Sequence, residues 1–515
     1  MYQLRKVLMH TVSRRSRRQV LKLLSGNSRC LSTMEPPPGE VQRLKQPQFA
    51  IPKGVMGQPT CYTHPHMVQE GYLTCGITQA EYVDRRDMLV TKLTQEIENE
   101  NTNHLIVIPA AAKQFMSDKI PYTFRQNSDF FYLTGCLEPC AVLVMVKPAQ
   151  QSTYNAILFV NDKDSHAELW EGPRTGCSAA TKLFAVNESR PVETLPQFLA
   201  KTATPKPTVL WYHTETPANP ELNPTIRGLL HQNTNIGWAD PQRAIHSMRV
   251  IKSAAEVELM KETCYIGSQS VNMAMACTKP GITEHTVNAV LEFTSRQAGA
   301  EHLSFPPVVA GGPRATHIHY INNNQMLTAN DLLLVDTGSQ RWLYNSDISR
   351  TWPVSGRFST YHRILYELVL SVQKRLIHLL GEHRQPLDQL FDQMCRLLGT
   401  HLQQEGILPK NIDGNELAAK AYRLCPHHVS HYLGLDVHDA PLVRRSIPVQ
   451  TNMVVTVEPG LYISPNDKSV PEEFRGIGIR VEDDVLITDN TPLVLTESCV
   501  KEVDDIEAIV GRHHL

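Results

Sequence analysis

Acidic residues lie in or directly after short apolar stretches in the second half of the chain, and this pattern limits how that half can fold. DLLLVDTG carries Asp336 at the end of its apolar run, MVVTVEPG carries Glu458 in the same position, and GIGIRVEDDVLIT contains Glu482. Apolar runs of this length predict buried strands. An unpaired carboxylate is costly to bury. In the folded protein these acids must therefore pair with cations, bind protons or lie in a turn that is open to solvent.

Two further stretches add charged groups to this set. NSDISRTWPV carries Asp347 eleven residues after Asp336, so a hairpin would place the two aspartates on adjacent strands. Strict alternation in GIGIRVEDDVLIT places Arg480 and Glu482 on one face of a single predicted strand. Each feature alone has an ordinary explanation, as a turn residue or a cross-strand salt bridge. Their occurrence together in one region favours a site.

The stretch SHYLGLDVHD supplies two histidines to the same region. His431 and His438 are seven residues apart, with Asp436 and Asp439 beside them. Such a histidine can bind a metal, transfer a proton or pack in a turn, and the stretch alone permits all three. The choice depends on which acids these histidines meet.

The length of 515 residues exceeds what one ordinary core accommodates, so more than one domain is expected. Residues 76–247 alternate helical apolar spacing with strand-like runs such as HLIVIPA, CAVLVMV, NAILFV and TVLWY, which predicts an α/β domain. A long amphipathic helix opens the second domain, residues 248–515. Its predicted N-cap is Ser253, and Glu256 completes a capping box.

The first part of the chain has a different composition. The first 34 residues contain eight Lys or Arg and no acid, which predicts a mitochondrial transit peptide over residues 1–31. A disordered basic tail and a nuclear signal are the alternatives. A start at Met34 would give a form without this leader, expected in the cytoplasm. Residues 32–75 are rich in proline, and because proline fixes φ and removes a donor, we expect an extended arm outside the core.

Composition argues against several other classes of protein. The formal net charge of −2 gives no reason to expect nucleic acid as a partner. No apolar run approaches the ~18 residues of a membrane span. The eleven cysteines are odd in number, scattered and without a C-x-x-C pair, which favours free thiols in a reducing compartment.

Seven ordered stretches resemble one known family. They are FRQNSDFFYLTG, SFPPVVAGG, IHYINNNQMLTANDLLLVDTG, NSDISRTWPV, SHYLGLDVHD, VTVEPGLYI and FRGIGIRVEDDV. Together they resemble aminopeptidase P, the X-Pro aminopeptidases of the pita-bread metallopeptidase group. The resemblance implies an α/β (α+β) protein in which an N-terminal α/β domain precedes a C-terminal pita-bread catalytic domain. The basic leader is typical of a mitochondrial member.

The resemblance also implies roles for single residues. Asp347 and Glu482 would bridge two metal ions, Asp336 would bind one ion and His431 the other, and Glu458 would contact the second ion and the attacking water. The implied metal ligands are thus Asp336, Asp347, His431, Glu458 and Glu482; the implied substrate-binding residues are His319, His427 and His438; and the implied catalytic residues are His319, His438, Glu458 and Arg480.

The chemistry of this set agrees with the resemblance. Two divalent cations would balance four carboxylates that otherwise repel one another. Oxygen-rich ligation with a single imidazole favours manganese. In the family mechanism, a hydroxide bridging the two ions attacks the carbonyl before proline, so the expected partners are peptides with proline at position two. Glu458 would transfer the proton, and His438 would help to stabilise the oxyanion.

Two alternatives remain open within this resemblance. A prolidase-type X-Pro dipeptidase shares the fold and the ligands, and a non-catalytic pita-bread protein would use the same fold only for binding. LWEGPRTG, which contains Trp170, resembles a family loop presented to another subunit, so we expect a homodimer. The segment DAPLVRRSIPVQTNM shows no aromatic residue where bacterial relatives form a wall of the proline pocket.

Overall fold

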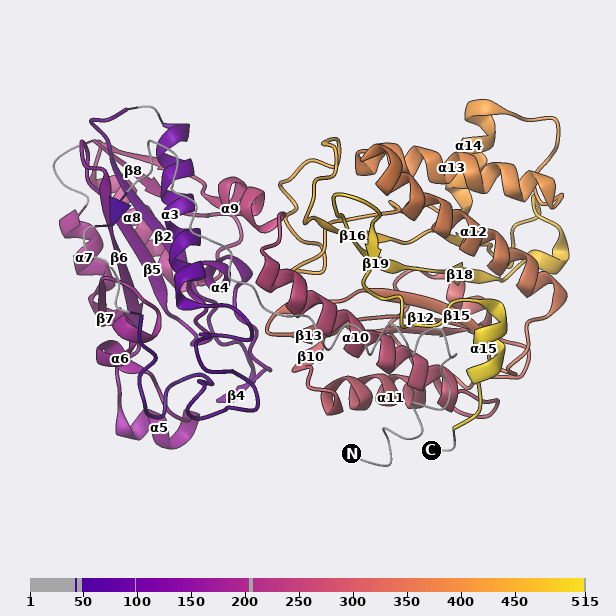
Figure 1. Ribbon diagram of the computed structural model, residues 1–515, viewed down its shortest axis with the longest axis horizontal. Helices are drawn as coiled ribbons and strands as arrows, with labels where there is room; N and C mark the ends of the chain where they lie inside the picture. The colour runs from indigo at the N-terminus through magenta and orange to yellow at the C-terminus, as the bar shows by residue number, and fades with distance from the viewer. Residues whose placement is uncertain (1–41, 44–48, 98, 203–206, 514–515) are drawn as a thin grey trace. The chain divides into compact units, whose positions relative to one another are not determined.

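The computed structural model describes residues 42–43, 49–97, 99–202 and 207–513 (Figure 1). The predicted leader, residues 1–31, and Met34 lie outside the described residues. Among the described residues, no helix is long and apolar enough to cross a lipid bilayer.

The first domain consists of a mixed sheet and the helices on its two faces. Its elements are β1 (Gln42–Arg43), α3 (Gln79–Glu96), β2 (Asn103–Pro109), β3 (Phe115–Ser117), β4 (Ile120–Pro121), α4 (Ser128–Thr134), β5 (Val142–Lys147), β6 (Thr153–Val160), α5 (Ser165–Glu171), α6 (Gly176–Leu183), β7 (Glu188–Pro191), α7 (Leu195–Thr202), β8 (Thr208–Trp211), α8 (Asn223–Gln232), β9 (Ile236–Ala239) and α9 (Gln242–Arg249).

The seven-stranded sheet of this domain has the order β1-β6-β5-β2-β8-β9, with β7 paired to β6. Successive side chains of its strands enter two separate apolar clusters, as the period of a strand requires. Ile106 of β2 belongs to the cluster with α3 and α4. Its neighbour Val107 belongs to the cluster with α7 and α8. The predicted α/β domain is therefore confirmed, and the strand-like runs of the sequence are its central strands.

The proline-rich segment differs from its prediction. Met56, Val68 and Leu73 are buried in the apolar cluster around α3 and α4. Gln58 donates to the Gly135 carbonyl at 3.1 Å and accepts from the Leu137 amide at 2.9 Å. The expectation of an arm outside the core is wrong for this part of the segment. Its prolines prevent regular structure, but the apolar residues between them still bury their side chains.

The second domain contains several small antiparallel sheets enclosed by helices. Figure 1 shows α12 and α13 on one side of its strands and α10 and α11 on the other. The elements are α10 (Ala254–Cys277), α11 (Glu284–Gln297), β10 (His302–Leu303), β11 (Val308–Gly311), β12 (Leu332–Thr337), β13 (Ser339–Arg341), β14 (Tyr344–Asn345), β15 (Ile348–Pro353), α12 (Thr360–His383), α13 (Leu387–Gln404), α14 (Gly414–Leu424), β16 (Val454–Val457), β17 (Gly460–Tyr462), β18 (Gly478–Arg480), β19 (Asp483–Leu486), β20 (Leu493–Val494) and α15 (Val503–Ile509).

The predicted capping box at the start of α10 is confirmed. Ser253 Oγ accepts from the Glu256 amide at 3.2 Å, and Glu256 Oε2 accepts from the Ser253 amide at 2.8 Å. The same hydroxyl donates to Glu81 of α3 at 2.6 Å. One side chain therefore both caps the long helix of the second domain and joins it to the first.

Ser253→Ala should lower the free energy of unfolding by ~1–2 kcal/mol, because both the cap and the contact with Glu81 are lost. Urea unfolding measures this change. Ser253→Thr keeps a capping hydroxyl and is the matched control. An unchanged unfolding midpoint in Ser253→Ala would show that the cap contributes nothing to stability.

Candidate active site

Antiparallel pairing brings the first two acids together. Strand β12 pairs with β11 on one side and β15 on the other, and Asp336 lies opposite Ser349 in the ladder with β15. Asp347 directly precedes β15. Asp336 thus lies on one strand and Asp347 lies directly before the neighbouring strand, close to the predicted hairpin arrangement, with β13 and β14 forming the connection.

The third and fourth acids lie at strand ends nearby. Glu458 directly follows β16. The stretch around Glu482 differs from its prediction, because the expected single strand is divided into β18, which pairs with β17, and β19, which pairs with β16. Glu482 lies in the break between them, where its amide donates to the Ser349 carbonyl at 3.0 Å. The break lets one continuous segment serve two sheets and leaves Glu482 facing the other acids.

His431 lies against the edge of β16. The neighbouring residue Tyr432 forms an isolated bridge with Val455. The His431 carbonyl accepts from the Thr456 amide at 3.0 Å, and the His431 amide donates to Thr456 Oγ1 at 3.2 Å. Thr456 also donates through its hydroxyl to Glu458 Oε1 at 3.4 Å. The backbone therefore fixes where the imidazole and Glu458 lie relative to each other.

The side chains described above converge. His431 Nε2 is 3.5 Å from Asp347 Oδ2 and 3.5 Å from Glu458 Oε1. Donor atoms of Asp347, His431 and Glu482 all lie within 4.8 Å of one another. Asp336 joins the group through Arg480, whose Nη2 donates to Asp336 Oδ2 at 2.6 Å.

Burial makes this group of carboxylates electrostatically unfavourable. Desolvation, followed by the charges of Glu482 and Asp336, raises the pKa of Asp347 well above its ordinary value. Desolvation and the charge of Glu458 raise the pKa of Glu482 in the same way. Burial raises the pKa of Glu458 to about 8, although Arg480 opposes the rise. Without cations, these acids would have to bind protons at neutral pH.

The imidazole beside the acids favours its neutral form. Desolvation, followed by the charge of His438, lowers the pKa of His431 to about 3. Its Nδ1 lies 3.1 Å from the Tyr432 carbonyl. That bond favours a proton on Nδ1 and leaves Nε2, which faces Asp347 and Glu458, as a free donor of electrons to a metal.

The donor set fits a divalent metal centre. Asp336 Oδ1 and Glu482 Oε1 are buried and accept no hydrogen bond within the described residues. Buried carboxylate oxygens without a donor are costly, and a cation satisfies them. Oxygen donors with one imidazole suit a hard or borderline divalent ion.

Arg480 organises the acids from behind. Its Nε donates to Ser349 Oγ at 2.7 Å, and Ser349 Oγ donates to Glu482 Oε2 at 2.8 Å. Its Nη1 donates to the Tyr462 hydroxyl at 2.7 Å, besides the ion pair with Asp336. Although burial opposes it, contact with Tyr462 and Asp336 raises the pKa of Arg480 well above its ordinary value. Arg480 therefore remains a cation and holds one oxygen of Asp336 in place.

The remaining predicted histidines border this group. His438 makes an edge-to-face contact with His431, with ring centroids 4.5 Å apart. His427 Nε2 lies 2.9 Å from the Tyr462 hydroxyl, and its Nδ1 lies 3.7 Å from Glu458 Oε2. His319 is exposed in a turn. Burial lowers the pKa of both His427 and His438, and the charge of His319 adds a smaller lowering to each. All three thus face the same region.

Sequence reasoning missed several residues that complete the site. Ser349 and Thr351 follow Asp347 at steps of two, so the period of β15 could have placed them on the same face. Thr351 Oγ1 accepts from the Arg480 amide at 3.2 Å. Tyr462 lies in the quoted stretch VTVEPGLYI, but nothing in its spacing indicates the bonds it makes to Arg480 and His427.

A further missed contact lies beneath Asp347. Asp484 Oδ2 accepts from the Asp347 amide at 3.0 Å and from Cys264 Sγ at 3.2 Å. Burial raises the pKa of Asp484 to about 8, and burial also raises the pKa of the Cys264 thiol well above its ordinary value. The ten cysteines of the described residues are all free, as predicted.

Comparison with known protein families matches both domains. Residues 258–489 match metallopeptidase family M24, and residues 82–211 match the aminopeptidase P N-terminal domain. Xaa-Pro aminopeptidase 3 of Homo sapiens is 39% identical over 474 residues, covering 90% of this chain and 92% of that protein. The mitochondrial intermediate cleaving peptidase 55 of Arabidopsis thaliana is 36% identical, covering 89% of this chain and 88% of that protein.

Solved structures agree with these matches. Icp55 from Saccharomyces cerevisiae superposes with a TM-score of 0.76 at 33% identity, covering 86% of this chain and 99% of that chain. Zinc-substituted Escherichia coli aminopeptidase P in complex with product gives a TM-score of 0.76 at 31% identity, covering 84% and 98%. The two domains, the converging acids and these relatives together place the chain in the aminopeptidase P family of metallopeptidases, with a pita-bread catalytic domain.

Proposed function

We propose that this enzyme hydrolyses the bond between an N-terminal residue and a following proline in peptides. The observation that carries the proposal is the convergence of Asp347, Glu458 and Glu482 around His431, with buried carboxylate oxygens left for a cation. The relatives named Xaa-Pro aminopeptidase give the substrate class.

We propose two divalent metal ions per subunit, most favourably Mn²⁺, because the donors are mainly oxygens. Such ions supply Lewis acidity, which polarises the scissile carbonyl and lowers the pKa of water. The residues proposed to hold them are Asp336, Asp347, His431, Glu458 and Glu482.

The surrounding side chains divide the remaining work of the proposed reaction. Glu458 accepts the proton of the attacking water and passes it to the proline nitrogen as the C–N bond breaks. His438 and His319 face the carbonyl oxygen, where negative charge develops. His427 binds the substrate from the side of Tyr462. Arg480 is a positioning residue that keeps Asp336 and Glu482 in place.

Product analysis with three peptides tests this proposal. Release of Arg from Arg-Pro-Pro without cleavage of Gly-Pro supports an aminopeptidase P activity, whereas cleavage of Gly-Pro alone indicates a prolidase. Arg-Ala-Pro is the third substrate, because some relatives are named intermediate cleaving peptidases and residues 439–453 contain no aromatic residue. Comparable release of Arg from Arg-Ala-Pro would show single-residue trimming without a requirement for proline. No cleavage of any peptide in the metal-loaded protein would indicate a non-catalytic protein.

We also propose a mitochondrial location, supported by the basic leader and by the Arabidopsis thaliana relative, which is named a mitochondrial peptidase. Residues 1–31 should be removed after import, which N-terminal sequencing of protein from purified mitochondria would detect. Recovery of intact Met1 inside the organelle would contradict processing. Full-length precursor found only in the cytosol would contradict targeting.

We propose that the protein is a homodimer. Leu169 and Trp170 are the most exposed of the large apolar side chains in the described residues, at 79% and 77%. They lie on α5, in the stretch LWEGPRTG. Exposed apolar side chains that adjoin each other favour contact with another subunit.

A further inference from the structure

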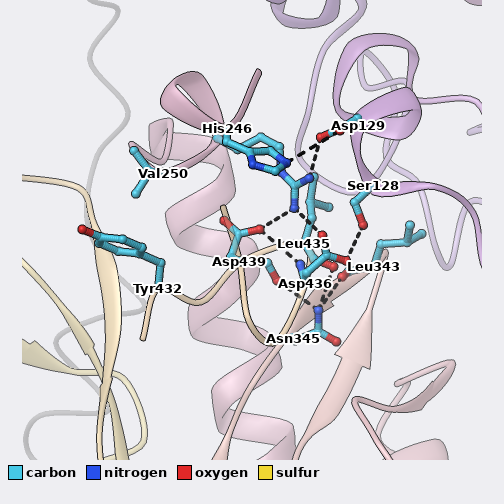
Figure 2. Close-up of polar contacts among 12 residues, drawn as sticks. Ser128, Asp129, His246, Val250, Leu343, Asn345, Tyr432, Leu435, Asp436 and Asp439 are labelled. Atoms are coloured by element: carbon cyan, nitrogen blue, oxygen red, sulfur yellow. Dashed lines mark hydrogen bonds and ion pairs between the residues drawn. The ribbon is translucent and has the colours of Figure 1, made fainter. Parts of the chain in front are cut away.

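A buried arginine joins the first domain to the segment that carries both site histidines. Arg249, the last residue of α9, donates from Nη1 to Asp129 Oδ1 of α4 at 2.6 Å. Its Nη2 donates to Asp436 Oδ2 at 2.6 Å and to Asp439 Oδ1 (Figure 2). Asp129 belongs to the first domain, while Asp436 and Asp439 lie on either side of His438. We call these four charged residues, Asp129, Arg249, Asp436 and Asp439, the clamp.

The charges of the clamp are balanced by two further cations. Lys252 Nζ donates to Asp439 Oδ2 at 3.0 Å, and Arg125 Nη2 lies 3.2 Å from Asp436 Oδ1. Burial would raise the pKa of Asp439, but Arg249 and Lys252 hold it at about 2. Three acids thus meet three cations. Removing one partner of a buried ion pair is costly, because the other charge is left buried and unpaired. The clamp therefore has one preferred arrangement.

The clamp fixes the backbone between the two histidines. The Asp436 amide donates to Asp439 Oδ1 at 3.3 Å, and the Asp439 amide donates to the Tyr432 carbonyl at 2.9 Å. A Cβ added to Gly434 would lie 2.7 Å from Asp439 Oδ2 and 2.9 Å from Lys252 Nζ. The turn can therefore approach the clamp this closely only with glycine at position 434.

The same turn also contacts the strand that leads to Asp347. Asn345 Nδ2 donates to the carbonyls of Gly434 at 3.1 Å and Leu435 at 2.9 Å (Figure 2). From the first domain, Ser128 Oγ donates to Asp436 Oδ1 at 2.7 Å. The turn that ends at His438 is therefore held between the first domain and the strand next to a predicted metal ligand.

We propose that Arg249 and Asp129 are positioning residues, through which the first domain sets the placement of His438 in the active site. The inference rests on the proposed peptidase function. It gives the first domain a part in catalysis, although none of the proposed metal ligands comes from that domain. It also assigns Asp436 and Asp439 to holding the turn, and not to binding metal.

Asp129→Asn tests the proposal, because within the described residues the side chain of Asp129 pairs with Arg249 and His246 of α9 and makes no hydrogen bond to the turn or to a proposed ligand. The change removes one charge at the far end of the clamp and leaves the bonds from Arg249 to Asp436 and Asp439 in place. We expect kcat for Arg-Pro-Pro to fall about fivefold to twentyfold, since a small misplacement of a catalytic group is costly. KM and bound metal should stay within twofold of wild type.

Glu81→Gln is the matched control. It weakens another contact between the domains, the bond from Ser253, without touching the clamp, and should leave kcat unchanged. Asp436→Asn and the double variant with both substitutions, Asp129→Asn and Asp436→Asn, complete a double-mutant cycle. If both aspartates act through Arg249, the double variant should be little slower than Asp436→Asn alone.

Each outcome separates the proposals. A wild-type protein that cleaves none of the peptides contradicts the proposed function. A wild-type protein that cleaves Arg-Pro-Pro, with kcat unchanged in Asp129→Asn despite a lower melting temperature, makes the clamp purely structural. An equal fall of kcat in Glu81→Gln shows a general effect of loosening the domains, and fully additive effects in the cycle show that the two aspartates act separately. Any of these last three results overturns the role assigned to Arg249.

Discussion

Asp347→Asn should remain folded and cleave Arg-Pro-Pro more than ~10³-fold more slowly than wild type, a loss of about 4 kcal/mol of transition-state stabilisation. Its carboxylate lies within 4.8 Å of ligand atoms of both His431 and Glu482, where the proposed bridging role requires a negative charge. Asparagine keeps the shape of the side chain, so the hydrogen bond from the backbone amide of residue 347 to Asp484 should survive.

The same change should stabilise the metal-free protein at neutral pH. The pKa of Asp347 is raised in the folded state. When the pKa of a carboxyl group is raised in the folded state, the protein becomes less stable as the pH rises above the unfolded-state pKa, near 4. Asparagine cannot ionise, so it removes that loss. Thermal unfolding with and without added metal should therefore show a higher melting temperature for metal-free Asp347→Asn than for metal-free wild type, with less gain on adding metal.

Metal analysis and turnover are measured beside Asp504→Asn, an exposed aspartate with a side chain 96% accessible, which should behave as wild type. Activity of Asp347→Asn within about tenfold of wild type, equal to about 1.4 kcal/mol, would contradict the bridging role.

His438→Ala should retain metal and lose turnover, whereas His431→Ala should lose metal. His431 presents Nε2 to Asp347 and Glu458, so its removal takes away a ligand in the ground state. His438 contacts His431 ring to ring and is not among the converging donor atoms. Loss of a transition-state donor typically costs ~10²–10³ in kcat.

Metal stoichiometry and specific activity of the folded fraction distinguish these roles. His317→Ala is a suitable control, because His317 is an exposed histidine near His319 and has no proposed role. If His438→Ala loses as much bound metal as His431→Ala, the assignment of different roles to the two histidines is wrong. If both variants only lower the melting temperature, both histidines serve packing alone.

The elements and acids of the site were predictable because they depend on local sequence. A run such as LLLVD predicts a buried strand, and the acids lie near the strand ends as the pattern indicated: Asp336 is the last but one residue of β12, and Glu458 directly follows β16. The capping box at Ser253 involves residues three apart, so it too is visible in the sequence.

Other features depend on contacts between distant residues, and the sequence does not reveal them. Alternation in GIGIRVEDDVLIT predicts one strand, but pairing with two partners divides it. The proline-rich segment packs into the core because the first domain offers it an apolar surface. Arg249 lies 120 residues from Asp129 and 190 from Asp439, so no spacing rule connects them.

The contact between Cys264 and Asp484 has a consequence for redox chemistry. Oxidation of a cysteine to sulfenic acid needs a thiolate that peroxide can reach. The Cys264 thiol is fully buried and its pKa is raised, so it offers neither. The sulfur atom, which the carboxyl group of Asp484 links to the amide of Asp347, is therefore shielded from oxidants. We expect this amide to keep its hydrogen bond under conditions that modify exposed thiols.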